Sequence, residues 1–164
     1  MSAVEVARGV RLGVDVGDVR VGLARSDRDA LLATPVETVS GDRTAQLARI
    51  AEVARDLEAV GIVVGLPRHL SGAEGRAAAV ARGYAEALAQ ACQPVPVRLV
   101  DERLTTVSAH QALHHAGRPS RRHREVVDQV AAVMILQAAI DQERRTGHPA
   151  GELVVADHEM KGES

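Results

Sequence analysis

A carboxylate in the middle of an apolar run is the first residue whose type and position suggest chemistry. Asp15 interrupts the stretch Val10–Gly17, which has the composition of a strand. Strand interiors are poor in Asp, because a buried carboxylate must be paired, hydrogen-bonded or bound to a cation. Asp15 therefore either holds a cation or shapes the turn that begins at Gly17.

Two later acidic residues occupy similar positions. Glu102 directly follows the apolar stretch Val95–Val100, and open α/β sheets bind ligands beyond the carboxyl ends of parallel strands. Asp101 precedes it, and alternation along a strand sends the two side chains to opposite sides. Only one of the pair is therefore expected to face a site. Asp128 is in register with apolar positions of a helical segment, so it faces inward or lies at the border of the apolar stripe.

Three carboxylates from separate segments are the donor set of a divalent-metal site. Mg²⁺ and Mn²⁺ prefer oxygen ligands. Two such ions about 4 Å apart activate water and stabilise the leaving oxygen in phosphodiester cleavage. Because the ions lower the pKa of the attacking water, no His or Lys base is required. The residue types therefore fit metal-dependent cleavage of a phosphodiester.

The elements that position these carboxylates follow from periodicity and turn residues. Pro35 indicates that the third strand lies at a sheet edge, and Asp42 is the expected N-cap of the first helix. Strands are expected at about 10–16, 21–24, 31–39, 61–67 and 95–100. Helices are expected over about 43–60, 77–91, 105–117 and 125–145. The order β-β-β-α-β-α-β-α-α predicts an α/β domain with a mixed five-stranded sheet and helices on both faces.

Composition narrows the class of protein. A chain of 164 residues suffices for one core without disulfides, and the lone Cys92 suits a reducing compartment. The sequence shows no secretory signal and no apolar run of membrane-spanning length, so we expect a cytoplasmic protein without a membrane partner. Tyr84 is the only aromatic residue, which disfavours binding of single strands by base stacking. It lies on an apolar helical stripe and is expected in the core.

Positive charge is concentrated although the net charge is only −2. Guanidinium groups suit phosphate contacts, so an arginine-rich loop before the last helix is a candidate nucleic-acid contact, the alternative being a solvated loop. Its arginines are Arg118, Arg121, Arg122 and Arg124. Further candidate phosphate contacts beside the carboxylates are Arg20, Arg103, Thr105 and Thr106. Residues 148–164 form an acidic tail that is either flexible or adds an edge strand through its Leu-Val-Val run.

Four motifs together resemble the YqgF (RuvX-like) family, bacterial proteins of RNase H-like fold related to the Holliday junction resolvase RuvC. They are GVDVG followed by RVGLA at 13–24, VGLP at 64–67, DERLTT at 101–106 and DQVAAVMILQ at 128–137. The resemblance extends from about residue 9 to 145. The DERLTT run and the helix motif are its specific parts.

The resemblance implies a nuclease domain of RNase H-like fold over residues 1–147. Asp15, Glu102 and Asp128 match the family's catalytic, metal-binding carboxylates, which hold Mg²⁺ or Mn²⁺, as two ions. Family members are assigned to maturation of the 5′ end of 16S ribosomal RNA, and others are described as Holliday junction resolvases. The implied substrate is therefore an rRNA precursor, with ribosomal particles as partners, or alternatively branched four-way DNA. The sequence leaves open whether the protein is a monomer or a homodimer.

Two other classes of protein share such a fold. Actin-like ATPases and sugar kinases open with a similar Asp-x-Gly hairpin, but they need two such domains to enclose a nucleotide. A chain of 164 residues with one hairpin cannot supply both. A non-catalytic RNA-binding assembly factor is the other alternative, and the presence of all three carboxylates argues against it.

Overall fold

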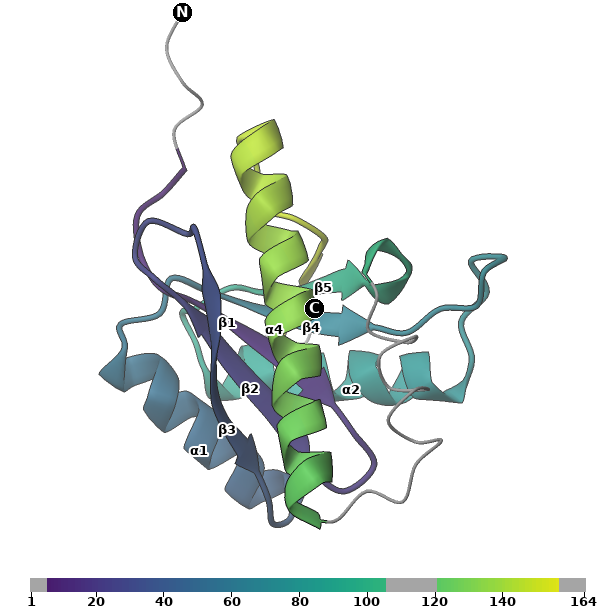
Figure 1. The fold of residues 1–164 in the computed structure, drawn as a ribbon. Helices are drawn as coiled ribbons and strands as arrows, with labels where there is room; N and C mark the ends of the chain where they lie inside the picture. The colour runs from purple at the N-terminus through teal and green to yellow at the C-terminus, as the bar shows by residue number, and fades with distance from the viewer. Residues whose placement is uncertain (1–5, 106–120, 157–164) are drawn as a thin grey trace, which may run out of the picture.

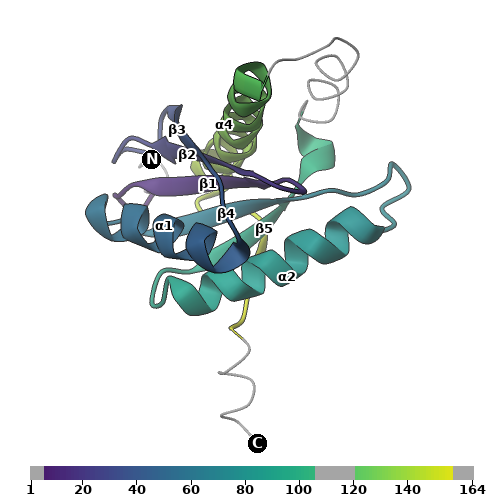
Figure 2. The ribbon, with the colours of Figure 1, turned by 90° about the horizontal axis from the view of Figure 1, so that it is seen from below.

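A single twisted sheet separates two helical layers (Figure 1, Figure 2). The structure is a computed structural model that describes residues 6–105 and 121–156, apart from the side chains of 104 and 121–124. The strands are β1 (Arg11–Val16), β2 (Val21–Ser26), β3 (Ala33–Val39), β4 (Gly61–Leu66), β5 (Val97–Asp101) and β6 (Glu152–Val154). The helices are α1 (Arg43–Asp56), α2 (Arg76–Ala91), a 3₁₀ turn (Glu102–Leu104) and α4 (Arg121–Thr146).

The sheet is mixed, in the order β3-β2-β1-β4-β5-β6. The first three strands form an antiparallel meander, whereas β4 and β5 run parallel to β1. The five predicted strands are all present. A sixth, β6, pairs antiparallel with β5, so the Leu-Val-Val run adds an edge strand. The predicted boundary between a domain ending at 147 and a flexible tail remains a prediction.

β3 lies at the opposite edge of the sheet, as Pro35 predicts. Pro35 pairs with Ala24 of β2 beside an irregularity in the register. Proline lacks an amide hydrogen, so it is tolerated at an edge or a bulge but not in a central strand. Pro35, which has no backbone N–H to donate to a neighbouring strand, therefore accounts for the edge position of β3.

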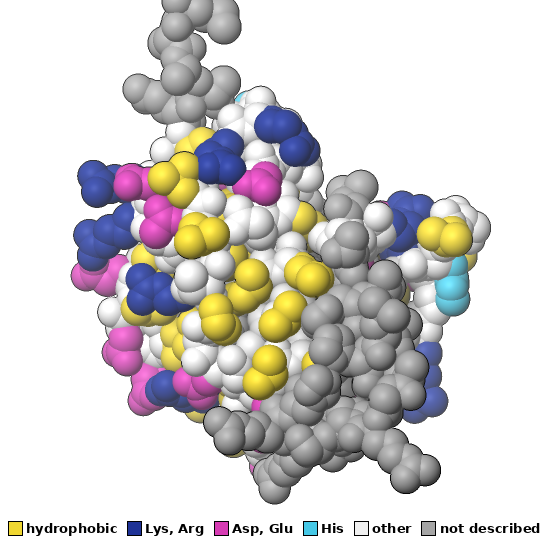
Figure 3. Space-filling model, in the orientation of Figure 1, with side chains coloured by type: hydrophobic (Ala, Val, Ile, Leu, Met, Phe, Trp, Pro, Cys, Tyr) yellow, Lys and Arg dark blue, Asp and Glu magenta, His cyan; other side chains and the backbone are white. Residues whose placement is uncertain are grey.

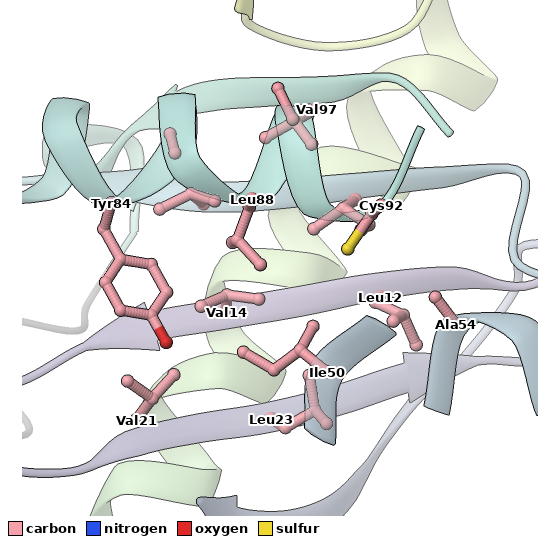
Figure 4. Close-up of a cluster of buried hydrophobic side chains, with 14 of the residues drawn as sticks. Leu12, Val14, Val21, Leu23, Ile50, Ala54, Tyr84, Leu88, Cys92 and Val97 are labelled. Atoms are coloured by element: carbon pink, nitrogen blue, oxygen red, sulfur yellow. The ribbon is translucent and has the colours of Figure 1, made fainter. Parts of the chain in front are cut away.

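The face of the sheet toward α1 and α2 carries the larger core. Alternate residues of the strands, such as Leu12, Val14 and Leu23, pack there against Ile50 and Leu88 (Figure 4). Because side chains alternate along a strand, the intervening positions face α4. The two faces of β1 thus have different compositions, and Asp15 belongs to the α4 face.

Tyr84, which is predicted to be in the core, lies in the larger core together with Cys92. Tyr84 and Cys92 are buried (Figure 4). Burial raises the pKa of the Cys92 thiol to about 11, which keeps it protonated at neutral pH. An inert thiol is therefore consistent with its surroundings.

α4 crosses the other face of the sheet and brings small residues close to it. Ala131 and Ala132 are fully buried, together with Ile135 and Leu136. The approach is closest at β2, where a Cβ atom at position 22 would lie 2.0 Å from the backbone carbonyl oxygen of Asp128. Only glycine fits there. The position of α4 over β2 therefore depends on position 22 being a glycine, which has no side chain.

Two helix boundaries differ from the prediction. α4 begins at Arg121, not near 125, because arginine is a good helix former and its charges do not break a helix. α1 ends at Asp56 rather than running to Gly61. Glu58 adopts a left-handed conformation (φ 52°) and reverses the chain, while Gly61 begins β4. The helix predicted over 105–117 lies outside the described residues.

The outer face of α4 is largely apolar. Figure 3 shows hydrophobic side chains gathered over this helix, with charged side chains toward the periphery. Val126 is exposed, and Val133 and Met134 are half-buried. This stretch of surface offers little for phosphate contacts. No helix in the described ranges combines the length and apolar character needed to cross a membrane.

Candidate functional site

The hairpin turn between β1 and β2 is fixed by its backbone. The amide of Gly17 donates to the carbonyl of Arg20 at 3.0 Å, and a Cβ at position 17 would lie 2.6 Å from that oxygen. Glycine is therefore required for the turn to close. The turn follows Asp15 by one residue and directs Arg20 toward α4.

Asp15 and Asp128 come together through Gly22. Asp15 is paired with Gly22 across the β1–β2 ladder, and Gly22 lies under the backbone carbonyl of Asp128. Asp15 itself is buried, with 5% of its surface exposed. Two carboxylates more than a hundred residues apart in the sequence are thus neighbours between the sheet and α4.

Glu102 reaches the same space from β5. A Cβ at position 65 would lie 2.5 Å from Glu102 Oε1 and 2.6 Å from Ile135 Cδ1, so Gly65 of β4 leaves room for this side chain. Glu102 is 8% exposed. Asp101 lies on the other side, where Arg103 donates to it through Nε and Nη2. The two side chains separate as strand alternation predicts.

Burial and mutual repulsion make these carboxylates hard to ionise. The pKa of Asp15 rises from 3.8 to about 7, mainly because of burial and further because of the charges of Glu102 and Asp128. The pKa of Glu102 rises from 4.5 to about 7 because of burial and the charge of Asp101. Clustered acids with raised pKa values at the carboxyl ends of neighbouring strands are typical of a functional site.

The donor set fits a hard divalent cation, but one donor is engaged elsewhere. Carboxylate oxygens are the ligands that Mg²⁺ and Mn²⁺ prefer. The raised pKa of Asp15 reflects burial first and then the negative charges of Glu102 and Asp128, and a bound cation would offset both. In the described ranges no three acidic, histidine or cysteine side chains stand close enough to hold one ion as they are placed. Asp128 Oδ2 instead accepts a hydrogen bond from Arg20 Nε at 3.0 Å.

Comparison with known proteins assigns the chain to a family. The family model described as "RuvX: Holliday junction resolvase" matches residues 9–142, a stretch that contains all three carboxylates. The chain belongs to the RuvX family. The resemblance seen in the motifs of the sequence is thereby confirmed.

RuvX relatives in other bacteria are about half identical to this chain. A protein of Nocardioides is 55% identical over 151 residues, covering 89% of this chain and 96% of its own. One of Streptomyces coelicolor is 53% identical over 146 residues, with coverages of 88% and 87%. One of Mycobacterium tuberculosis is 56% identical over 136 residues, with coverages of 82% and 80%. All three carry the name "Putative pre-16S rRNA nuclease".

Among solved structures the RuvX chain is similar to RuvC of Thermus thermophilus. RuvC in complex with a Holliday junction substrate gives a TM-score of 0.57 at 18% identity, covering 86% of this chain and 98% of that one. RuvC alone gives 0.52 at 18% identity, covering 86% and 99%. At this identity the likeness establishes the fold, which is RNase H-like as expected.

The residues predicted to contact phosphates are partly engaged within the protein and partly outside the described residues. Arg20 is paired with Asp128, and Arg103 with Asp101. The Thr105 hydroxyl donates to the carbonyl of Glu102 and so closes the 3₁₀ turn. Thr106 and Arg118 lie outside the described residues. The backbone of Arg121, Arg122 and Arg124 forms the first turn of α4, and their side chains are outside the described part of the chain.

Sequence reasoning missed the polar residues that fix the hairpin turn. The Tyr84 hydroxyl donates to Gln46 Oε1 at 3.0 Å, and Gln46 Nε2 donates to the carbonyls of Val19 and Gly41. Gln46 is buried in the apolar stripe of α1. A glutamine at a helix position that faces the core is the signal that could have identified it.

Two further glutamines hold α4 against β3. Gln129 Nε2 donates to the Thr38 hydroxyl, which donates to the carbonyl of Glu125. Gln137 accepts from the amide of Ala33 and donates to the carbonyl of Leu31. Both glutamines belong to the DQVAAVMILQ motif. The motif therefore serves to dock the helix that carries Asp128 as well as to supply that carboxylate.

Proposed function

We propose that this RuvX chain is a divalent-metal-dependent nuclease that cleaves phosphodiester bonds in the 16S rRNA precursor, at the maturation of its 5′ end. The observation that carries the proposal is the buried Asp15 between the sheet and α4, near enough to Glu102 and Asp128 that the charges of both raise its pKa. The relatives are about half identical to this chain over most of their length. Their name, "Putative pre-16S rRNA nuclease", supports the rRNA precursor as the substrate.

The three carboxylates would hold the metal, as Mg²⁺ or Mn²⁺ and in the form of two ions. Bound ions would supply an activated water and would stabilise charge on the leaving oxygen. Asp15 and Glu102 must lose their protons before they can serve as ligands, and their pKa values near 7 place that step close to neutral pH. Their burial limits the access of bulk water to the site.

The nucleic acid would lie across the carboxyl ends of β1 and β5, where Asp15 and Glu102 are found, and close to the start of α4. Arginines at 118, 121, 122 and 124 would contact phosphates, as would the hydroxyls of Thr105 and Thr106. Such contacts position a substrate without reading its sequence. We place this activity in the cytoplasm, on ribosomal particles or free precursor, with the enzyme as a monomer or a homodimer.

Cleavage of four-way DNA junctions is the second candidate function. It is favoured by the description of the family model and by the fold shared with RuvC. Junction resolution requires two symmetric cuts and hence a dimer. A protein that is monomeric at working concentration and still cleaves RNA would count against it.

Side-by-side cleavage assays test the proposal. A structured RNA spanning the 5′ end of 16S rRNA and a synthetic four-way DNA junction would each be incubated with Mg²⁺, Mn²⁺ or a chelator. Asp15→Asn serves as the inactive control. We expect metal-dependent cleavage of the RNA that the variant lacks. Cleavage of the junction alone would favour the second candidate, and binding without cleavage of either would favour an assembly factor.

A further inference from the structure

We infer that Arg20 exchanges partners during the catalytic cycle, from the carboxylate of Asp128 to a phosphate of the substrate. The inference rests on the proposed function and adds an order of events to it. Arg20 occupies Asp128 before metal is bound. Entry of the metal at Asp128 frees Arg20, so metal loading and nucleic-acid binding favour each other.

The Arg20–Asp128 pair is weak enough to be exchanged. It consists of one hydrogen bond, from Nε, and the two side chains are 22% and 19% exposed. The neighbouring Arg103–Asp101 pair is different, because Arg103 donates through both Nε and Nη2 and its backbone amide also binds Asp101. A part-exposed pair with a single contact contributes little to stability.

The rest of the guanidinium group is available to a ligand. Within the described ranges the terminal nitrogens of Arg20 donate to no protein group. A guanidinium carries five N–H donors in a planar fork that matches the oxygens of a phosphate. Once a metal at Asp128 has displaced Nε, the whole fork of Arg20 is free to bind a phosphate through two or more N–H donors, which the paired guanidinium cannot present in full.

The backbone of Arg20 stays fixed while its side chain moves. Its carbonyl accepts from Gly17, and the adjacent Val19 carbonyl accepts from Gln46. Gln46 is in turn held by Tyr84. The exchange thus needs only a side-chain rotation, which keeps the guanidinium within reach of both the carboxylates and a phosphate beside them.

Charge sets the direction of the coupling. A divalent ion and Arg20 are both cations, so they compete for Asp128, whereas Arg20 and a phosphate attract. Metal binding should therefore raise the affinity for nucleic acid, and nucleic acid should raise the affinity for metal by the same factor. Because Arg20 competes with the metal, removing it should strengthen metal binding and weaken nucleic-acid binding.

Two binding measurements on the full chain test this. Mn²⁺ affinity would be measured by calorimetry, and binding of a phosphorothioate-protected stem-loop RNA by anisotropy with Mg²⁺ or with chelator. For Arg20→Gln we expect a Mn²⁺ dissociation constant about two- to fivefold lower, the range that a part-exposed ion pair represents. We also expect weaker RNA binding and a smaller effect of Mg²⁺ on it. Arg49→Gln is the control. Arg49 lies on α1, where it pairs with Glu37 of β3 and Glu52 of α1, so its loss should change neither constant.

Nuclear magnetic resonance of the wild-type protein gives a test that needs no variant to fold. The ¹⁵Nε–H signal of Arg20 should shift and exchange faster with water when Mg²⁺ is added, because its bond to Asp128 is lost. An unchanged signal at saturating Mg²⁺ would overturn the exchange.

The failures of the two proposals are distinguishable. If wild type binds Mn²⁺ and Asp15→Asn does not, but Arg20→Gln binds it equally or more weakly, the exchange is wrong and the metal site stands. If wild type does not bind Mn²⁺, or Asp15→Asn binds it as well, the metal site and the exchange both fail.

Discussion

The backbone carbonyl of Asp128 lies so close over Gly22 that a Cβ at position 22 would come within 2.0 Å of its oxygen. Gly22 is the ladder partner of Asp15. One contact therefore fixes both the depth of α4 on the sheet and the distance between two carboxylates of the site.

Gly22→Ala should push α4 away from the sheet. We expect a loss of stability of about 1–3 kcal/mol from overpacking, together with loss of Mn²⁺ binding, because Asp128 moves away from Asp15. Urea unfolding and calorimetry measure the two effects. Gly83→Ala is the matched control, since a Cβ there meets nothing within 4 Å, and alanine in a helix should stabilise α2 by up to about 1 kcal/mol. Normal metal binding by Gly22→Ala would contradict this account.

Asp15→Asn should stabilise the metal-free protein at alkaline pH. The pKa of Asp15 is raised by folding, so the folded state holds this proton more tightly than the unfolded state. The free energy of unfolding of wild type therefore falls as pH rises from about 4 to about 7 and stays low above that. We expect the variant to be more stable than wild type by about 2–4 kcal/mol at pH 8, and similar to it near pH 4.

Urea unfolding at both pH values, in the presence of chelator, measures this difference. Mg²⁺ should reduce it at pH 8 by stabilising wild type alone. A variant that is less stable than wild type at pH 8 would show that the Asp15 carboxylate is needed for the fold.

Glu102→Gln and Asp101→Asn should separate the two adjacent acids. Glu102 lies near Asp15 in the space between the sheet and α4, so Glu102→Gln should lose Mn²⁺ binding and should lower the cleavage rate by more than about 100-fold. Asp101 holds Arg103 and caps the 3₁₀ turn, so its variant should lose about tenfold or less, as supporting residues do. Steady-state cleavage and metal titration distinguish them, and equal losses would argue against this division of roles.

Tyr84→Phe should loosen the hairpin turn from the far side of the sheet. The change leaves Gln46 Oε1 buried without its donor, at a cost of about 1–3 kcal/mol. Amide hydrogen exchange should accelerate at residues 17–20, and the thermal midpoint should fall. Unchanged exchange in the turn, despite a lower midpoint, would show that Gln46 holds Val19 without help from Tyr84.

Arg11 and Glu143 form a buried ion pair at the other end of the α4 face, with an Nη2–Oε2 distance of 2.9 Å. Glu143→Leu alone leaves a buried guanidinium without its counter-charge and should cost about 3–5 kcal/mol. The double change Arg11→Met and Glu143→Leu should recover most of that loss. Chemical unfolding of wild type, Arg11→Met, Glu143→Leu and the double variant forms a double-mutant cycle. If the losses of stability in the two single variants simply add up in the double variant, the two side chains are not coupled.

The sequence was sufficient for the parts of the site that depend on local rules. Strand alternation separated Glu102 from Asp101. Helical spacing left Asp128 either inward-facing or at the border of the apolar stripe, and the structure has its side chain partly buried beside Arg20. Pro35 identified the edge strand. In each case the periodicity of one element determined which way a side chain points.

The remaining features depend on contacts between distant segments. The pairing of Arg20 with Asp128 and the role of Gln46 arise only when the hairpin, α1 and α4 meet. The predicted start of α4 is too late, because a cluster of four arginines in seven residues suggests a loop although arginine favours helix. β6 is too short for its own periodicity to identify it, and its pairing with β5 decides its structure.

The glycines under the site have a consequence for protein engineering. Changes to the carboxylates alter the chemistry of the ligands, whereas Gly22 and Gly65 set the space in which any ligands can meet. Only glycine fits at position 22, and a side chain at position 65 would displace Glu102, so a library that varies the acidic residues should keep both glycines. Selecting such variants for binding of a larger cation than Mg²⁺ would change the ligands while the space between the sheet and α4 stays the same.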